Sequence, residues 1–260
     1  MTYDASALER STWVDRVVHH ERVSSTNDLA RQLAADTPRG KSLLVLADEQ
    51  TAGRGRGSNR WWTGEGSLAF SLLLDSPELG IPRRHAAMIS LAAAIALAET
   101  VAPLVPHARP GIHWPNDVFV SDRKLAGILV EALADGRHIV GVGMNVNNRL
   151  ALAPTDLQPT ITSLVDLTGR THDRTQLLLE LLGSLQAALQ QLTRSPADLA
   201  QRADSLCLQH GQRLAVDVGG NIDAGICAGI ADDGSLVLDT PAGPRNVYSG
   251  VLIKHASERN

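Results

Sequence analysis

Glycine and arginine alternate in one short segment, residues 53–62, which ends in two tryptophans. Glycine lets the backbone approach a ligand closely and adopt positive φ angles. Arg54 and Arg56 carry planar, permanently charged guanidinium groups that match phosphate or carboxylate oxygens. Trp61 adds a flat apolar surface on which a ring can stack. We predict a loop that closes over a phosphorylated, ring-bearing ligand; the alternatives are a solvated linker and an Arg/Gly tract that touches nucleic acid.

A second group of polar side chains surrounds a predicted β-hairpin. Lys124 opens an almost continuous apolar run, Asp-Gly at 135–136 favours a two-residue turn, and residues 138–146 form the return strand. In this register Ala126 lies opposite Asn145. Because opposed residues share a face that repeats every second residue, Lys124 and Asn145 are expected on one face, near the same end.

Asp117 is the third polar group expected there. The preceding strand ends at Val120, and residues 121–123 are the predicted turn. An even-numbered loop places Asp117 on the face of Lys124, whereas a three-residue loop or a bulge reverses it. Singly, each side chain is also explained as a solvated strand end or a turn cap. Their joint spacing is what indicates a ligand site.

The elements that must position these residues follow from periodicity and turn chemistry. Ser25 is a predicted helix cap. From about Gln209 onward, the helical periodicity gives way to short β-strand patterns separated by glycine-rich turns. The other expected elements are buried strands at 42–47 and 67–74, a helix at 83–101, and helices within 160–206. We predict an α+β fold with two domains. Residues 1–205 form a mixed β-sheet packed with helices, and residues 206–260 form a small SH3-like β-barrel.

Composition narrows the classes of function. Among 260 residues the net charge is -4, which argues against a dedicated nucleic-acid binder. Cys207 and Cys227 form neither a CxxC motif nor a disulfide framework, which fits a reducing cytoplasm. The longest apolar run, residues 86–98, is too short to span a bilayer. We expect a cytoplasmic protein that binds neither membrane nor nucleic acid.

Together, in their order along the chain, the motifs resemble those of biotin–protein ligases. The similarity is close over roughly residues 20–150 and looser over the C-terminal part. The motifs that carry it are Ser25-Thr26-Asn27, Glu49-Gln50, Gly53-Arg54-Gly55-Arg56, Trp114-Pro115-Asn116-Asp117, Lys124-Leu125-Ala126-Gly127-Ile128-Leu129-Val130-Glu131, and Gly141-Val142-Gly143-Met144-Asn145-Val146-Asn147.

The resemblance implies a two-step reaction with the substrates biotin and ATP and with Mg²⁺. Biotin and ATP give biotinyl-5′-adenylate and pyrophosphate, and the acyl group then passes to a lysine of a carboxylase's biotin carboxyl carrier domain. An anionic carboxylate attacks an anionic phosphate in the first step, so positive charge is required. The implied catalytic residues are Lys124, Arg54, Arg56 and Asp117, with Asp117 orienting or deprotonating the incoming lysine.

The resemblance also implies the binding residues. Ser25, Thr26 and Gln50 would contact biotin, Trp61 would stack on adenine, and Asn145 would hydrogen-bond it. The full binding set is Ser25, Thr26, Asn27, Gln50, Gly53, Gly55, Trp61, Asn116, Gly127, Gly141, Gly143 and Asn145. The last three glycines would leave room for flat ligands. No metal-ligating residue is predicted.

The chain departs from the family pattern in three places. His113 stands where lysine is usual, which weakens a phosphate contact there. Residues 57–59 are less basic than in many versions of the loop, so pyrophosphate binding would depend more on Arg54 and Arg60. Only residues 1–24 precede the first motif, so we expect a ligase without a DNA-binding repressor domain.

Two rival functions remain. A lipoate- or octanoate-transferring relative would share the fold, but the glycine-arginine loop and the Lys124-Leu125-Ala126-Gly127 motif argue against it. A non-enzymatic Arg/Gly RNA-binding protein would show salt-dependent binding without ATP use. The carrier that is modified, the formation of a homodimer and the role of the C-terminal domain are left open by the sequence.

Overall fold

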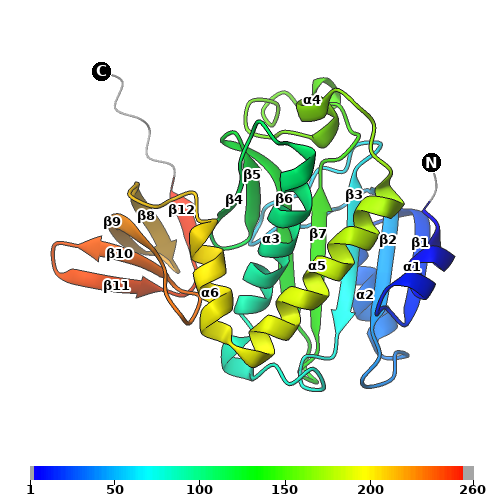
Figure 1. Ribbon diagram of the computed structural model, residues 1–260, viewed down its shortest axis with the longest axis horizontal. Coiled ribbons are helices and arrows are strands. Elements are labelled where there is room, and N and C mark those ends of the chain that lie inside the picture. Colours follow the sequence, from blue (N-terminus) through cyan, green and yellow to red (C-terminus); the bar gives the residue numbers. More distant parts are fainter. Residues whose placement is uncertain (1–2, 254–260) are drawn as a thin grey trace.

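A seven-stranded mixed sheet is the centre of the fold in the computed structural model, which describes residues 3–253 (Figure 1). Its strands are β1 (Arg16–Val23), β2 (Leu43–Gln50), β3 (Leu68–Leu74), β4 (Pro110–His113), β5 (Asp117–Val120), β6 (Arg123–Ala132) and β7 (His138–Met144). They lie in the order β1-β2-β3-β7-β6-β5-β4. Only β1 and β2 pair in parallel among these described strands.

Helices cover the two faces of this sheet unequally. The large apolar core lies beneath α3 (Met88–Val101), α5 (Arg174–Arg194) and α6 (Pro196–Ser205), which share one face in Figure 1. A smaller apolar cluster, including Ala30 and Ile139, packs α2 (Thr26–Ala34) on the opposite face. The short helices are α1 (Ala5–Ser11) and α4 (Leu164–Thr168). The face that α2 covers only in part is the one left for a ligand.

Two helix predictions have different outcomes. The side chain of Ser25 accepts a hydrogen bond from the Asp28 N–H and caps α2, as its position predicted. The helix expected over residues 83–101 is interrupted, because a 3₁₀ turn at Arg83–His85 precedes α3, which begins only at Met88. Residues 83–87 are exposed or only half-buried, so burial does not force this segment to continue the axis of α3.

A five-stranded antiparallel sheet follows the helices. Its strands are β8 (Arg213–Val218), β9 (Asn221–Ile230), β10 (Leu236–Thr240), β11 (Gly243–Val247) and β12 (Val251–Ile253), in the order β11-β10-β9-β8-β12. Within residues 3–253, the end strands β11 and β12 pair with β10 and β8 but not with each other, so the small sheet does not close. The α+β architecture with a small β-sheet domain is confirmed, whereas the boundary at 205/206 stays a prediction.

The predicted hairpin register is wrong by one residue. Ala126 pairs with Met144 and not with Asn145. The loop has three residues, because the Leu133 N–H donates to the Arg137 carbonyl at 2.8 Å and Gly136 takes a left-handed φ of 88°. A type I turn followed by a left-handed glycine is the usual three-residue hairpin, and the Asp-Gly pair serves it as well as the two-residue form.

A β-bulge between β5 and β6 nevertheless places Lys124 on the predicted face. The β5–β6 turn contains only Ser121 and Asp122, both with positive φ, and not the three residues predicted. The pairing of β5 with β6 shifts beyond it, so that Leu125 is an extra, fully buried residue. This bulge turns Lys124 to the face of Gly127, where its side chain lies over that glycine. The shared face was therefore predicted correctly from an incorrect register.

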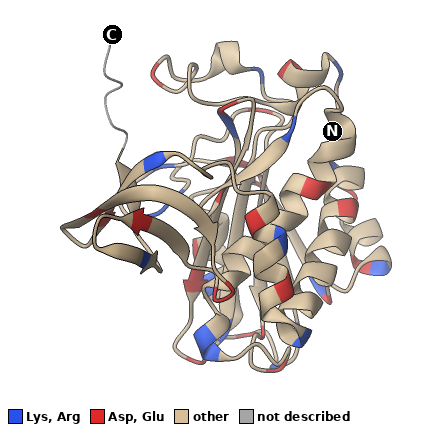
Figure 2. Ribbon diagram, turned by 60° about the vertical axis from the view of Figure 1, so that its left-hand side comes forward, with Lys and Arg blue, Asp and Glu red and all other residues tan. Residues whose placement is uncertain are grey.

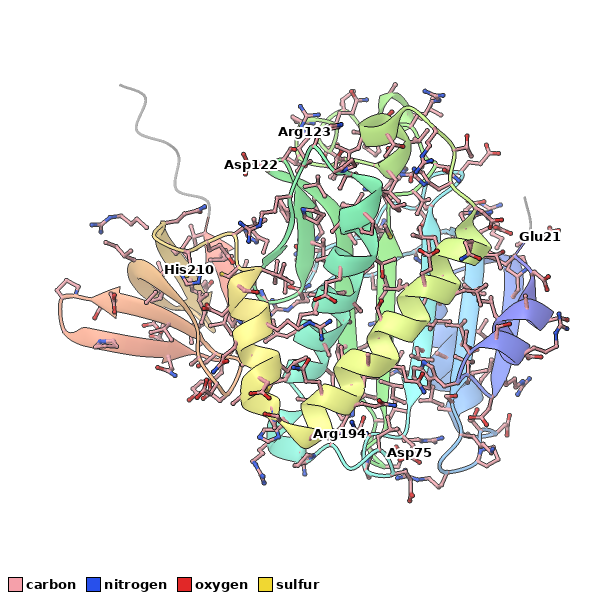
Figure 3. The ribbon with its side chains drawn as sticks, in the orientation of Figure 1. Glu21, Asp75, Asp122, Arg123, Arg194 and His210 are labelled. Atoms are coloured by element: carbon pink, nitrogen blue, oxygen red, sulfur yellow. The ribbon has the colours of Figure 1, made fainter. Side chains whose placement is uncertain are left out.

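Charged residues are spread over the outer surface. Lys or Arg positions (blue) and Asp or Glu positions (red) are interspersed along the helical ribbons in Figure 2. Asp122 and Arg123 lie at the β5–β6 turn, at the upper end of the large sheet in Figure 3. Between residues 3 and 253, none of the helices is long and apolar enough to cross a membrane.

Candidate active site

A cavity of about 850 Å³ lies on the sheet face that α2 covers in part. It collects residues from the loop after β2, the strands β5 to β7 and the C-terminal sheet. The predicted residues that line it are Ser25, Thr26, Asn27, Gln50, Arg54, Gly55, Arg56, Trp61, Asn116, Asp117, Lys124, Gly127, Gly141, Gly143 and Asn145. Gly53 is the exception: it lies at the base of the loop, where its carbonyl accepts from the Trp61 N–H at 2.9 Å.

The floor of the cavity is formed by glycines on two adjacent strands. Gly127 on β6 pairs with Gly143 on β7, and Gly141 follows on the same face. A Cβ atom on Gly143 would overlap the indole of Trp61, and one on Gly141 would overlap the amide of Asn27. The space that glycine leaves open is therefore used by these two side chains in this structure. A flat ligand over the same floor would meet the Trp61 ring directly.

The N-terminal end of α2 closes one side of the cavity with polar groups. The N–H and hydroxyl of Thr26 donate to Gln50 Oε1 at 2.9 and 3.1 Å. The Ser71 hydroxyl on β3 lies within hydrogen-bond distance of Thr26 Oγ1 and Asn27 Oδ1, at 2.8 and 2.5 Å, and can donate to one of them at a time. Thr26, Asn27 and Ser71 are buried, so these bonds hold their side chains in fixed directions. Ser71 was not singled out from the sequence, because serine inside an apolar strand gives no signal.

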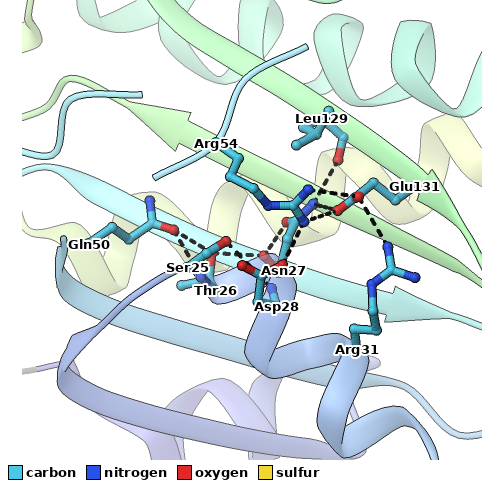
Figure 4. A network of polar contacts seen from close by, with 10 residues as sticks. Ser25, Thr26, Asn27, Asp28, Arg31, Gln50, Arg54, Leu129 and Glu131 are labelled. Carbon is cyan, nitrogen blue, oxygen red and sulfur yellow. Dashed lines mark hydrogen bonds and ion pairs between the residues drawn. The ribbon is translucent and has the colours of Figure 1, made fainter. Parts of the chain in front are cut away.

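Arg54 is held by two carboxylates (Figure 4). Its guanidinium donates to both oxygens of Glu131 at 3.0 and 2.6 Å and pairs with Asp28 at 2.8 Å. Asn27 and Arg31 also donate to Glu131, at 2.7 and 3.1 Å. The glycine-arginine loop is thereby tied to α2 and to β6 at once.

The charge state of Glu131 follows from these contacts. Burial by itself raises the pKa of the carboxyl, but hydrogen bonds from Arg54 and Asn27 and the nearby positive charges outweigh it, so the net pKa is lowered. Glu131 was not predicted from the sequence as a partner of Arg54. A signal existed, because Glu131 follows Gly127 by four residues along a strand and so shares its face.

Lys124 and Asp117 form an ion pair inside the cavity. Lys124 Nζ lies 2.7 Å from Asp117 Oδ2 and 5.7 Å from the centre of the Trp61 ring. The other carboxylate oxygen, Asp117 Oδ1, is buried and lacks a hydrogen-bond partner among residues 3–253. Asp117 therefore holds the lysine with one oxygen, while the hydrogen-bonding capacity of the other is unused within this part of the chain.

Arg56 connects the loop to the C-terminal sheet. Its guanidinium donates to Asn116 Oδ1 at 3.3 Å and to the Gly250 carbonyl at 3.2 Å. Burial lowers the pKa of Arg56, while the charge of Asp117 acts in the opposite direction. The C-terminal residues Leu208, Gln212, Gly250, Val251 and Leu252 also line the cavity. This part of the chain thus forms one wall of the site, which the sequence did not reveal.

Three asparagines after β7 have different surroundings. Asn145 lines the cavity, and its Oδ1 accepts from Asn148 Nδ2 at 2.9 Å. Asn147 faces away and bonds the backbone of His172 with both ends of its amide, at 2.8 and 2.9 Å. Asn148 was not named from the sequence, because a polar residue in a predicted loop gives no signal of its own.

His113 and Arg60, both named with the departures from the family pattern, lie at the cavity. His113 lines it, and its ring stacks on Phe119 with centroids 4.6 Å apart. Arg60 lines it as well and is exposed. Across the described part of the chain, His, Cys, Asp and Glu side chains nowhere gather in a group of three that could hold a metal ion.

Known proteins are similar to this chain in sequence and in fold. The sequence profile of the biotin/lipoate A/B protein ligase family matches residues 20–147. The biotin–[acetyl-CoA-carboxylase] ligase of Mycobacterium tuberculosis is 36% identical over 221 residues, which cover 84% of this chain and 81% of that protein. The enzyme of the same name from Paracoccus denitrificans is 35% identical over 85% of this chain and 93% of its own length.

Solved structures of biotin protein ligases also have this fold. Biotin protein ligase from Aquifex aeolicus, solved in complex with biotin and ATP, superposes with a TM-score of 0.80 at 27% identity and covers 92% of this chain and 98% of that one. The mixed sheet and its cavity thus define a protein of the biotin/lipoate ligase class. Within that class, the chain belongs to the biotin–protein ligase family.

Proposed function

We propose that this protein joins biotin to ATP, giving biotinyl-5′-AMP and pyrophosphate, and then transfers the biotinyl group to one lysine of a carboxylase carrier domain. One observation carries the proposal. The cations Lys124 and Arg56, the amide of Asn145 and the polar end of α2 converge on a single cavity. The relatives named above are biotin ligases, which favours biotin over lipoate as the acid that is activated.

Positive charge is the main requirement of the first step. A carboxylate oxygen of biotin attacks the α-phosphorus of ATP, a new O–P bond forms, and pyrophosphate leaves with the electron pair of the broken bond. Lys124 and Arg56 place positive charge at the cavity before the reaction begins, so little rearrangement is needed. The loss of one preorganised group of this kind costs about 10²- to 10³-fold in rate.

Proton acceptance is the main requirement of the second step. The amine of the carrier's lysine attacks the acyl carbon, AMP leaves, and the amine must lose a proton. An unperturbed lysine has a pKa of about 10.4, so a base or an orienting acceptor helps at neutral pH. Asp117 Oδ1, buried and without a partner among residues 3–253, is suited to that role.

Arg54 would anchor the loop over the adenylate. Its guanidinium is engaged by Glu131 and Asp28 across the cavity edge, which keeps residues 53–60 close to the ligand. Biotinyl-5′-AMP is a mixed anhydride that hydrolyses readily, so a loop that excludes water protects it. Direct contact of Arg54 with phosphate stays a prediction and would require it to exchange these partners.

Magnesium would arrive with the nucleotide. Mg²⁺ is commonly held by substrate phosphates, several waters and one or two carboxylates, and it supplies positive charge to the phosphates when bound. Asp117 lines the cavity and is the kind of single protein carboxylate that this mode would use.

The test is adenylate formation. We expect incubation with biotin, ATP and Mg²⁺ to yield biotinyl-5′-AMP, detected by mass spectrometry, and we expect no adenylate from lipoate. Lys124→Ala should lower the rate about 10²-fold or more because it removes preorganised charge. Lys41→Ala, which removes a surface lysine paired with Asp15, should leave the rate unchanged. A folded protein that forms no adenylate, or that prefers lipoate, would overturn the proposed function.

A further inference from the structure

We propose that Asn148 is a positioning residue that fixes the amide of Asn145, so that its NH₂ group and not its oxygen faces the bound nucleotide. The inference rests on the proposed function, in which Asn145 meets the adenine of ATP. It goes beyond that function because Asn148 is not among the residues that line the cavity. Asn148 would act on the nucleotide only through its neighbour.

The pair is buried and its backbone is fixed. Asn145 and Asn148 are 1% and 2% exposed. The Asn145 N–H donates to the Leu125 carbonyl at 2.9 Å, and its own carbonyl accepts from the Leu164 N–H at 3.1 Å. With the backbone held on both sides, the remaining freedom of Asn145 is the direction of its amide.

Two arrangements of the amides are conceivable, since oxygen and nitrogen differ only by the hydrogens they carry. In this structure Asn148 Nδ2 donates to Asn145 Oδ1 at 2.9 Å, and Asn148 Oδ1 is buried without a partner in the described part of the chain. Turning both amides round would instead leave the Asn148 NH₂ buried without an acceptor. A buried donor without a partner is rarer and costlier than an under-used oxygen, so the observed arrangement is favoured.

The consequence is a hydrogen-bond donor in the cavity wall. Because Asn145 Oδ1 is used by Asn148, the group of Asn145 left for a ligand is its NH₂. The ring nitrogens N1, N3 and N7 of adenine are acceptors, so a fixed donor matches the edge of this base. The neighbouring Asn147 cannot do the same, because both ends of its amide bond the backbone of His172.

The test combines substitutions at Asn148 with changes to the adenine base of ATP and compares their effects on adenylate formation. Asn148→Asp replaces the donor by a carboxylate that only accepts, so Asn145 must donate to it and turn its oxygen toward the nucleotide. Adenylate formation is measured with ATP and with 1-deaza-, 3-deaza- and 7-deaza-ATP. We expect the wild type to use at least one deaza analogue about tenfold less efficiently than ATP, as for a lost hydrogen bond of ordinary strength. In the variant this difference should fall below about threefold while the KM for biotin is unchanged.

Two further variants make the result specific. Asn147→Asp, the same change one residue earlier, should lower the melting temperature but preserve the discrimination between ATP and the analogue. If Asn148→Asp does not fold, Asn148→Leu, which donates nothing, should still reduce the discrimination at least twofold. An active wild type whose discrimination is absent, or is equal in the Asn148 variants, would overturn this inference alone. A wild type that forms no adenylate from ATP would overturn the proposed function, and the inference with it.

Discussion

The two oxygens of Asp117 differ in their surroundings. Oδ2 holds Lys124 at 2.7 Å, whereas Oδ1 is buried and has no hydrogen-bond partner among residues 3–253. Under the proposed function, Lys124 would supply charge in the first step and Asp117 would accept from the acceptor lysine in the second. One carboxylate would then take part in both steps.

At this scale we predict that Asp117→Asn spares adenylate formation and slows transfer. The amide is nearly isosteric but cannot take a proton, so transfer should fall about 10²-fold or more. Single-turnover experiments with preformed biotinyl-5′-AMP and a carrier domain isolate the second step. Asp122→Asn, at the exposed rim of the same cavity, is the matched control and should behave as wild type. Equal loss of both steps in Asp117→Asn would show that its role is not confined to transfer.

At the scale of elements, the ion pairs of Glu131 hold three segments together. The carboxylate on β6 receives Arg54 from the loop after β2 and Arg31 from α2. The net pKa of Glu131 is lowered in the folded protein. A carboxyl with a lowered folded pKa stabilises the fold above its unfolded pKa, about 4.3, and that contribution is lost as the pH falls through the folded value.

We predict that Glu131→Gln lowers the free energy of unfolding by a constant amount between about pH 6 and pH 8. The difference from wild type should shrink below about pH 4.3, where the unfolded wild type also becomes protonated. Denaturant unfolding at a series of pH values measures this. Glu78→Gln, on an exposed turn, should show no difference at any pH. If the loss of unfolding free energy in Glu131→Gln stays the same at acidic pH, the glutamate stabilises the fold by packing and not by its charge.

At the scale of the whole molecule, the small C-terminal sheet shares its core with the catalytic part. Leu236 and Leu238 belong to the same apolar cluster as α3, and Trp114 donates from Nε1 to the Gly234 carbonyl at 3.1 Å. Gly250 accepts from Arg56 in the cavity wall. The two sheets are thus joined both by burial and by the site.

We predict that the chain unfolds in one cooperative transition, observed at the same temperature by circular dichroism and tryptophan fluorescence. Leu236→Ala, at a fully buried position, should destabilise the whole protein by about 2–5 kcal/mol. Ile222→Ala, on the outer face of the same sheet at 64% exposure, should change stability by less than about 0.5 kcal/mol. Two separate transitions, with adenylate formation surviving the first, would show that the sheets are independent.

Local patterns were enough for most of the elements, and the family resemblance named residues of which all but Gly53 line the cavity. The cap at Ser25, the strands and the glycine-arginine loop depend on neighbours in the chain, so they are readable from it. The hairpin register was not readable, because the Asp-Gly pair suits loops of two and of three residues. The bulge at Leu125, which returns Lys124 to the correct face, has no local sequence signature either.

The sequence by itself determined the class of fold, the order of the motifs and the chemical types gathered for the reaction, because periodicity, turns and residue chemistry are local properties. Only the tertiary structure decided which partners these residues have. Arg54 meets Glu131 across 77 positions of the chain, and Arg56 meets Gly250 across 194. Such contacts depend on how the elements pack and on which buried polar groups would otherwise lack a partner, and no short stretch of sequence contains that information.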